Sequence, residues 1–289
     1  MLPEQKGNVD RRFPDAESFW TAVKGDTDCK HRVSRKDESK ERKPWSGTKS
    51  FEEAMKLAEL GWAEGATKCK AMTDQLTVVL GSMVRVPEVV FDVTGDCMDM
   101  GAVMEGCPEH WMSDQESEEE VRDQSHGRMV RISVNVSAAS NVPAEWMVNR
   151  AAAIAAFVEI AERSGRVAEI ICCEGVDKGK HIWSYPAKRV DEPLQMDRLA
   201  FSCGHPSMLR RIAFSLQETE PRSIRSRHGF EGGCYGSPAD LPKDHSLRGD
   251  IHFGELRRND PNSECFSTLE GAEKRIKQLL KEQGIIAAD

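Results

Sequence analysis

The sequence predicts an α/β protein whose C-terminal part is a three-layer domain, with a mainly parallel sheet between two layers of helices. Three observations predict it: an alternating apolar run at 130–136, a long apolar stretch at 144–163 and a nearly continuous apolar run at 167–173. Alternation is typical of a strand, and a continuous apolar run is typical of a strand covered on both faces. The order strand, helix, strand therefore predicts a right-handed βαβ unit.

Each element of this unit has its own signal. Four β-branched residues alternate with polar ones in the first strand: Val130, Ile132, Val134 and Val136. β-Branched side chains pack well on a pleated sheet. Pro143 suits the first turn of a helix, and apolar residues then surround the helix axis from Ala144 to Arg163. Gly165 is expected to end this helix, which should be buried against the sheet.

Two further strand and helix units are predicted after residue 173. Residues 197–203 and 249–253 are expected to be strands, while 205–216 and 268–281 have apolar residues at helical spacing. Ligand sites in parallel sheets lie beyond the carboxyl ends of the strands. We therefore expect three turns to converge there, those after Asn135, Cys203 and Phe253.

The first part of the chain predicts a smaller mixed α+β region over residues 1–112. Helices are expected at 16–23, at 51–60 after a Ser50–Glu53 capping box, and at 63–79. A strand at 86–93 and a helical turn at 100–104 follow. The acidic run at 113–125 is interpreted as a solvated linker or loop, and 126–289 as the second domain.

Composition restricts the classes of function. The chain has 289 residues, nine cysteines and a formal net charge of −8. No apolar run is long enough to span a membrane and the first residues are polar, so we expect a soluble cytoplasmic protein without a membrane partner. The cysteine spacing does not indicate a disulfide framework, which favours reduced thiols. The negative charge argues against general attraction to nucleic acid.

The turn Asn135-Val136-Ser137-Ala138-Ala139-Ser140 carries the first resemblance. It resembles a degenerate form of the metal-binding Asp-x-Ser-x-Ser turn of von Willebrand factor A domains, and with the βα order it makes the C-terminal half similar to such a domain. These domains usually bind proteins and often act as adaptors beside ring-forming ATPases. Asn135 lacks the carboxylate that Mg²⁺ favours, so we expect no bound metal.

The leading hypothesis is consequently a non-enzymatic protein-binding or adaptor protein. Its contact residues are expected in the converging turns: Asn135, Ser137, Ser140, His205 and Ser207. A serine nucleophile at Ser137 is disfavoured because its flanks lack a Gly-x-Ser-x-Gly elbow.

Zinc and thiol chemistry are weaker alternatives. Cys97, Cys107 and His110 form one group of soft ligands, and Cys203, His205 and Cys234 form another. Neither group has the paired short spacings of zinc modules. Free thiols beside unrelated histidines are the simpler interpretation, and the same holds for a Cys-His nucleophilic pair.

Nucleic-acid binding or processing is the competing hypothesis. Residues 30–43 contain seven Lys or Arg against three Asp or Glu, and a second basic cluster spans 210–227. Arginine suits phosphate groups because of its planar fork of donors. The candidate residues are Arg32, Arg35, Lys36, Arg210 and Arg211. A solvated basic surface is the ordinary alternative, because acidic residues interrupt both clusters.

Five segments over most of the chain carry a second resemblance: Ser50-Phe51-Glu52-Glu53-Ala54, Gly61-Trp62, Phe91-Asp92-Val93-Thr94-Gly95-Asp96, Arg131 to Ile154, and Asp250-Ile251-His252-Phe253-Gly254. Together they resemble an uncharacterised protein family met mainly in tailed-phage genomes. The resemblance implies a bacteriophage source and hence the host cytoplasm. It adds a third alternative, a structural component of the virion, and leaves the partner and the oligomeric state open.

Overall fold

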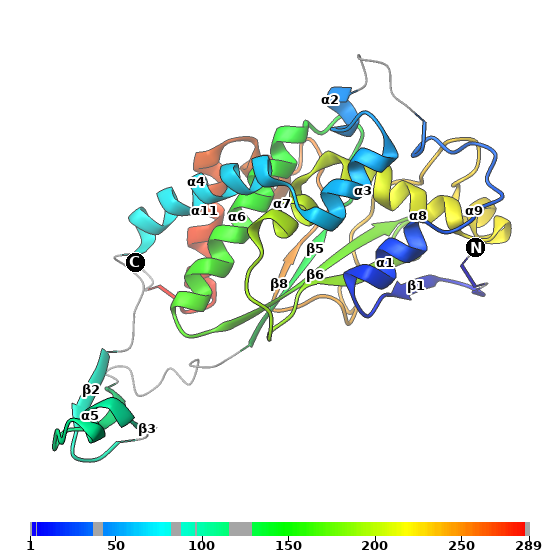
Figure 1. The fold of residues 1–289 in the computed structure, drawn as a ribbon. Helices are drawn as coiled ribbons and strands as arrows, with labels where there is room; N and C mark the ends of the chain where they lie inside the picture. The colour runs from blue at the N-terminus through cyan, green and yellow to red at the C-terminus, as the bar shows by residue number, and fades with distance from the viewer. Residues whose placement is uncertain are drawn as a thin grey trace.

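The protein is built around a five-stranded sheet with the strand order β1-β7-β6-β5-β8 (Figure 1). The computed structural model describes residues 2–3, 5–36, 43–81, 88–95, 97–115 and 129–286. The strands are β1 (Val9–Arg12), β5 (Met129–Asn135), β6 (Val167–Val176), β7 (His181–Lys188) and β8 (Ile251–Phe253). β5 runs parallel to β6 and β8, and β1 runs parallel to β7, whereas β6 and β7 are antiparallel. The predicted mixed α/β class with a mainly parallel sheet is confirmed.

The βαβ unit has the predicted boundaries. α6 (Ala144–Arg163) follows β5, begins after Pro143 and has most of its side chains buried. Gly165 adopts a φ of +80° just past the helix end, a conformation that favours glycine. Val134 of β5 lies opposite Cys172 of β6, so the two predicted apolar runs are direct neighbours.

The region after β6 differs from the prediction. The expected strand at 197–203 is a helix, α7 (Met196–Gly204), and the strand that pairs with β6 is β7, which was not predicted. A short apolar run is compatible with either element, because periodicity alone does not separate a buried helix from a buried strand. The antiparallel β6 and β7 pair also breaks the expected alternation of strand and helix.

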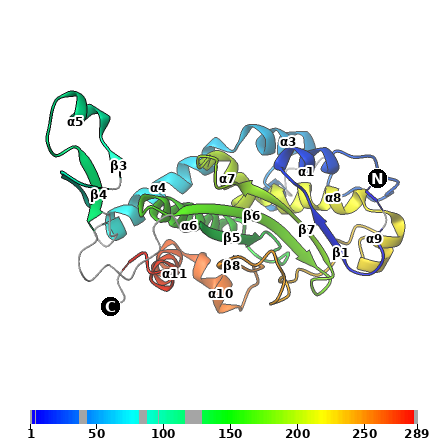
Figure 2. The ribbon, with the colours of Figure 1, turned by 90° about the horizontal axis from the view of Figure 1, so that it is seen from below.

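Apart from α6 and α7, the described helices of the main body are α1 (Ala16–Val23), α2 (Lys43–Ser46), α3 (Phe51–Leu60), α4 (Ala63–Gly81), the π-helix η1 (Met208–Ala213), α8 (Phe214–Thr219), α9 (Arg222–His228), α10 (Pro261–Glu264), the 3₁₀-helix η2 (Cys265–Ser267) and α11 (Leu269–Glu282), of which α11 and η2 pack against α6. Figure 2 shows α1, α3, α4, α7 and α8 together on one side of the strands. α1, α6 and α7 contact the strands, and α4 packs outside α6 and α7. The Phe19 ring of α1 stacks on Tyr185 of β7 at 4.6 Å between centroids.

The opposite face of the sheet is covered by irregular chain. Cys173 and Ile182 point to this face and pack with Leu241 and Leu247 from the segment between α9 and β8. The described helices that contact the strands therefore lie on the other face, and the expected second helical layer is not confirmed. None of the described helices combines the length and apolar character needed to cross a membrane.

The N-terminal residues are part of this main body. β1 is an edge strand of the sheet, and side chains of α1, α3 and α4 belong to the same hydrophobic core as β5 and α6. A small antiparallel sheet stands to one side (Figure 1), with β2 (Glu88–Asp92), β3 (Cys97–Met98), α5 (Met100–Met104) and β4 (Trp111–Gln115). Residues 113–115 of the predicted acidic linker belong to β4, and 116–125 lie outside the described residues.

Candidate functional site

The predicted turn after β5 is held by its own hydrogen bonds. Asn135 Oδ1 accepts from the Ser137 amide at 3.0 Å, and Asn135 Nδ2 donates to the Ala239 carbonyl at 2.8 Å. Ser137 Oγ donates to the Gly175 carbonyl at 2.9 Å. Asn135 and Ser137 are buried, whereas Ser140 is exposed. The polar groups of this turn therefore join β5 to β6 and to the irregular segment, which is a structural role.

The other two predicted contact residues lie elsewhere. His205 Nδ1 accepts from the Ser207 amide at 3.1 Å, and Ser207 Oγ donates to the Ser46 carbonyl at 2.6 Å. Both side chains are buried. Ser137 and Ser140 line one cavity and His205 lines another, so the five predicted residues do not form one surface.

The arginines of the nucleic-acid hypothesis hold the chain before α3 in place. Arg211 is buried and donates to four main-chain carbonyls, those of Ser34, Lys36, Thr48 and Lys49. Arg210 is also buried and donates to the carbonyls of Trp45 and Val142. Arg32 and Arg35 likewise donate to carbonyls, such as those of Cys29 and Val23. These contacts favour a structural role for the four guanidinium groups, and Lys36 is the exposed member of the set.

A serine, a histidine and an aspartate form a hydrogen-bonded chain on the irregular face of the sheet. Ser133 Oγ lies 2.7 Å from His252 Nδ1, and His252 Nε2 lies 2.6 Å from Asp240 Oδ1. Burial raises the pKa of Asp240, but the His252 hydrogen bond, the charges of His252 and Arg248 and the Leu241 amide together outweigh it, so the net pKa is lowered. Ser133 is completely buried in β5, so its hydroxyl is not accessible to a substrate. The residue types resemble a hydrolase triad, but these hydrogen bonds connect β8 to β5 and have a structural role.

Cysteine chemistry has little support in the geometry. Burial raises the pKa of Cys203 to about 12, which keeps its thiol protonated. Cys97 and Cys107 are exposed, and His110 Nδ1 bonds to the Cys107 carbonyl. Within the described ranges, no three His, Cys, Asp or Glu side chains group together as metal ligands.

A cavity of about 300 Å³ lies at the carboxyl end of β5 and β6, where the fold predicts a ligand site. Ser137 and Ser140 of the predicted protein-contact set and Arg210 of the nucleic-acid set line it, and so does Glu174, which was not predicted. Glu174 Oε2 accepts from Trp183 Nε1 and, at 2.9 Å, from Gln217 Nε2. Burial raises the pKa of Glu174 to about 7. A charged residue inside the apolar run of β6 was the signal that could have found it.

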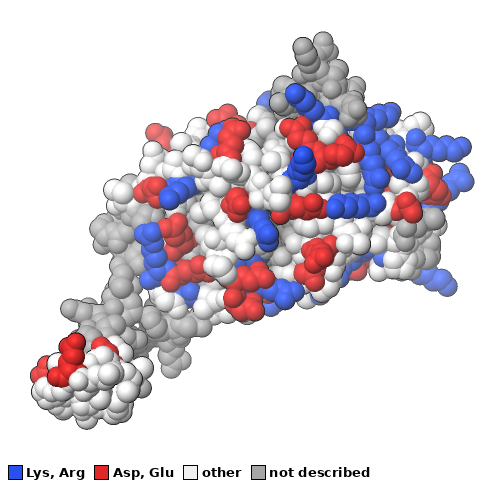
Figure 3. Space-filling view, in the orientation of Figure 1, with Lys and Arg blue, Asp and Glu red and all other residues white. Residues whose placement is uncertain are grey.

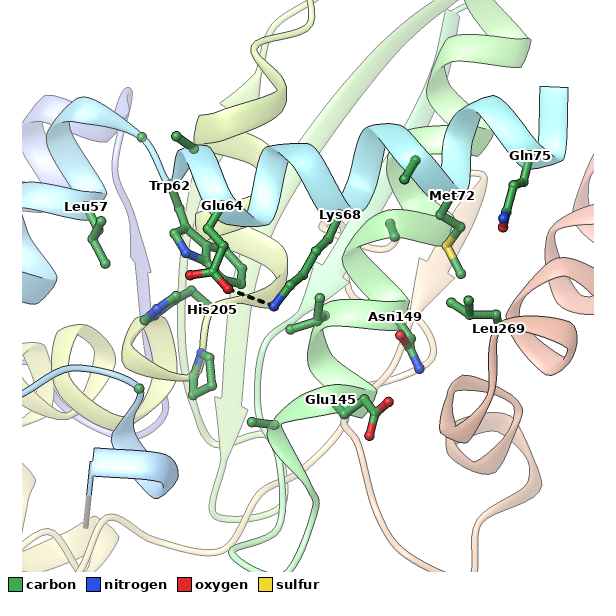
Figure 4. A pocket seen from close by; sticks show the side chains of 18 of the residues that line it. Leu57, Trp62, Glu64, Lys68, Met72, Gln75, Glu145, Asn149, His205 and Leu269 are labelled. Atoms are coloured by element: carbon green, nitrogen blue, oxygen red, sulfur yellow. Dashed lines mark hydrogen bonds and ion pairs between the residues drawn. The ribbon is translucent and has the colours of Figure 1, made fainter. Parts of the chain in front are cut away.

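A larger groove of about 1060 Å³ runs along α4 (Figure 4). Trp62, just before α4, and Glu64, Lys68 and Met72 of α4 extend toward the start of α6. His205 and Leu269 lie toward the two ends of the groove. The His205 ring stacks on Phe201 and meets the edge of Trp62 at 4.6 Å between centroids. Burial lowers the pKa of His205 to about 4, so it is a neutral wall of the groove.

Comparison with known protein families gives a match over nearly the whole chain. A family profile described as a domain of unknown function, DUF7192, matches residues 4–287. The chain belongs to the DUF7192 family. No curated protein and no solved structure matches the chain. The function of this DUF7192 protein therefore has to be argued from its geometry.

Proposed function

We propose that this DUF7192 protein is a protein-binding module that holds a short, basic, amphipathic segment of a partner in the groove along α4. The shape and chemistry of this groove are the observation that supports the proposal. Its wall runs from Trp62, just before α4, along α4 to Gln75, which corresponds to roughly 20 Å. That length accommodates nearly four turns of a bound helix, at about 5.4 Å a turn.

The interior of the groove offers apolar anchor points. Leu57, Trp62 and Val148 are half-buried and Met72 is buried, so their exposed parts form an apolar floor. Leu269 is 50% exposed at one end. Amphipathic helices commonly lay an apolar face into a groove of this kind, and methionine adapts to different partners.

The charges around the groove determine the kind of partner. Three carboxylates line it, those of Glu53, Glu64 and Glu145, against one ammonium, that of Lys68. Lys68 Nζ pairs with Glu64 Oε1 at 2.9 Å. The groove is therefore net acidic, which favours a segment with lysine or arginine on its polar face.

Defined peptides test the proposal. One labelled 14-residue peptide carries leucine on one face and lysine on the other, and a second replaces every lysine with glutamate. Fluorescence anisotropy should show binding of the lysine peptide, at least tenfold tighter than the glutamate peptide. Leu269→Gln should weaken binding about fivefold, because partial burial of a leucine is worth about 1 kcal/mol. The matched control is Leu60→Gln, which changes a leucine that is 76% exposed and outside the groove.

Charge reversal tests the acidic character of the groove independently. Glu145→Lys at the groove should weaken binding of the lysine peptide, whereas Glu105→Lys in the small antiparallel unit should not. Equal affinities of the two peptides, or equal effects of Leu269→Gln and Leu60→Gln, would refute the groove as the docking surface. We further propose that the protein acts as an adaptor beside a ring ATPase and comes from a bacteriophage. The β5-α6-β6 unit supports a proposed relationship to von Willebrand A domains.

Nucleic-acid binding is the second candidate, supported by the surface charge. Figure 3 shows Lys and Arg side chains gathered over the end of the body that holds α8, α9 and the N-terminus. The exposed basic residues of this part include Lys30, Lys36, Arg222 and Arg227, and the Arg225 to Asp28 ion pair places α9 beside the 28–36 segment. A gel shift that weakens steeply with salt would support this candidate, and no shift at low salt would exclude it. Mass spectrometry of purified particles tests the virion alternative.

A further inference from the structure

The cavity at the carboxyl end of β5 and β6 is separate from the α4 groove and has a different chemistry. Its walls come from five parts of the chain: the end of β6, the turn after β5, η1 with the start of α8, residues 233–238, and Val33 with Trp45. Three aromatic rings line it, those of Trp45, Phe214 and Tyr235. Phe214 and Tyr235 are stacked at 3.8 Å between centroids. The cavity therefore offers flat aromatic walls around a small volume.

Most polar groups of these walls already have partners. Ser137 Oγ donates to the Gly175 carbonyl, and the Tyr235 hydroxyl donates to Glu218 Oε1 at 2.6 Å. Arg210 donates to the carbonyls of Trp45 and Val142, and its guanidinium lies 4.8 Å from the Trp45 ring centroid. These groups shape the cavity, but they are not the acceptors or donors that a ligand would use first.

Glu174 differs from them. It is 1% exposed, and both of its donors, Trp183 and Gln217, reach the same oxygen, Oε2. Among the described residues none donates to Oε1. In the same network, the buried Gln217 Oε1 has no partner within the described part of the chain. Glu174 lines the cavity, so a ligand there that carries an N–H group would find in Oε1 an acceptor that Trp183 and Gln217 do not use.

We propose that this cavity binds a small planar nitrogen heterocycle whose N–H groups donate to Glu174 Oε1 while its ring lies among Trp45, Phe214 and Tyr235. A volume of about 300 Å³ suits a ligand of nucleobase size. Aromatic walls favour a flat ring through stacking. The position beyond the strand ends is the one at which parallel sheets bind ligands. The proposal does not depend on the α4 groove.

Two probes of equal shape test the donor requirement. 2-Aminobenzimidazole presents adjacent N–H donors, and 2-methylbenzoxazole has the same ring size with none; guanosine is a third probe that extends the N–H edge to a nucleoside. Isothermal titration calorimetry on the full chain should show binding of 2-aminobenzimidazole or guanosine and none of 2-methylbenzoxazole. At about pH 8, above the Glu174 pKa of about 7, the carboxylate is ionised, and Glu174→Gln should weaken binding roughly ten- to a hundredfold, the effect of losing a hydrogen bond to a charged group. The glutamine oxygen keeps the Trp183 and Gln217 contacts and turns an amide donor toward the cavity.

A second pair of variants separates occupancy from folding. Ser140 is exposed and lines the cavity, whereas its neighbour Asn141 is exposed and does not. Ser140→Trp should block binding, and Asn141→Trp should leave it unchanged. Binding of 2-methylbenzoxazole as tight as that of 2-aminobenzimidazole, unchanged binding in Glu174→Gln or in Ser140→Trp, or no binding of either N–H probe at millimolar concentration would each overturn the proposal.

Discussion

Glu174 should make the protein less stable as the pH rises through neutrality, and Glu174→Gln should remove this effect. Burial raises the pKa of Glu174 from 4.5 to about 7. Between these values the folded chain holds a proton that the unfolded chain has released. The stability that comes from this group is therefore complete below about pH 4.5 and lost as the pH rises through about 7. Since one pKa unit corresponds to about 1.4 kcal/mol, the loss is about 3 kcal/mol.

His205 acts in the opposite direction over nearly the same range. Burial lowers its pKa from 6.5 to about 4, so the unfolded chain holds the extra proton between these values. The stability from neutral His205 is present above about pH 6.5 and lost as the pH falls through about 4, again by about 3 kcal/mol. The two slopes oppose each other in the wild type. In Glu174→Gln only the His205 effect remains, so the free energy of unfolding should rise with pH between about 4 and 6.5. In His205→Asn only the Glu174 effect remains, so the free energy of unfolding should fall with pH between about 4.5 and 7.

Urea unfolding followed by tryptophan fluorescence at a series of pH values measures these slopes. Glu174→Gln should also be more stable than the wild type at about pH 8 by up to about 3 kcal/mol, because an amide replaces a buried carboxylate and still accepts from Trp183 and Gln217. Glu192→Gln, at an exposed position, is the control and should follow the wild type. If Glu174→Gln kept the wild-type dependence of unfolding free energy on pH from about 4.5 to 7, the buried, protonated carboxyl inferred here would be wrong.

Three further substitutions test the packing. Arg211→Lys should lower the free energy of unfolding by about 2–4 kcal/mol, because one ammonium cannot donate to all four carbonyls that Arg211 contacts. Limited proteolysis should then cut within 34–49, and an unchanged cleavage pattern would contradict the role of Arg211 in holding this segment. Gly204→Ala places a Cβ 2.5 Å from that of Ala151 and should cost about 1–3 kcal/mol; adding Ala151→Gly should restore part of the urea midpoint, and no recovery would argue against this contact. Ser50→Ala removes an N-cap that accepts from Glu53 at 3.1 Å and should cost about 1 kcal/mol in thermal unfolding; an unchanged midpoint would show that the cap contributes nothing.

The fold was predictable where a pattern was long and had one physical meaning. The β5-α6-β6 unit combined β-branched alternation, a twenty-residue apolar helix and a buried strand, and each element lies where it was expected. The Ser50 cap is equally local, because both partners lie within one helical turn. By contrast, β1 has only four residues and gains its place from pairing with β7, more than 160 positions away. No local pattern contains that information.

The position of the cavity followed from the sheet, whereas the surroundings of its side chains did not. Parallel strand order directs attention to the carboxyl end of β5 and β6, and a cavity lined by Ser140 and Arg210 lies there. Residue type alone, however, suggested that Asn135 and Arg211 were available to partners, whereas long-range contacts with main-chain carbonyls occupy both. The reverse holds for Glu174, whose neighbours in sequence, Cys172 and Cys173, indicate a buried strand. A carboxylate that remains in such a run needs donors from elsewhere in the fold, and here they come from β7 and α8 and reach one oxygen. The other oxygen, which these two donors do not reach, is the acceptor that the proposed heterocycle uses.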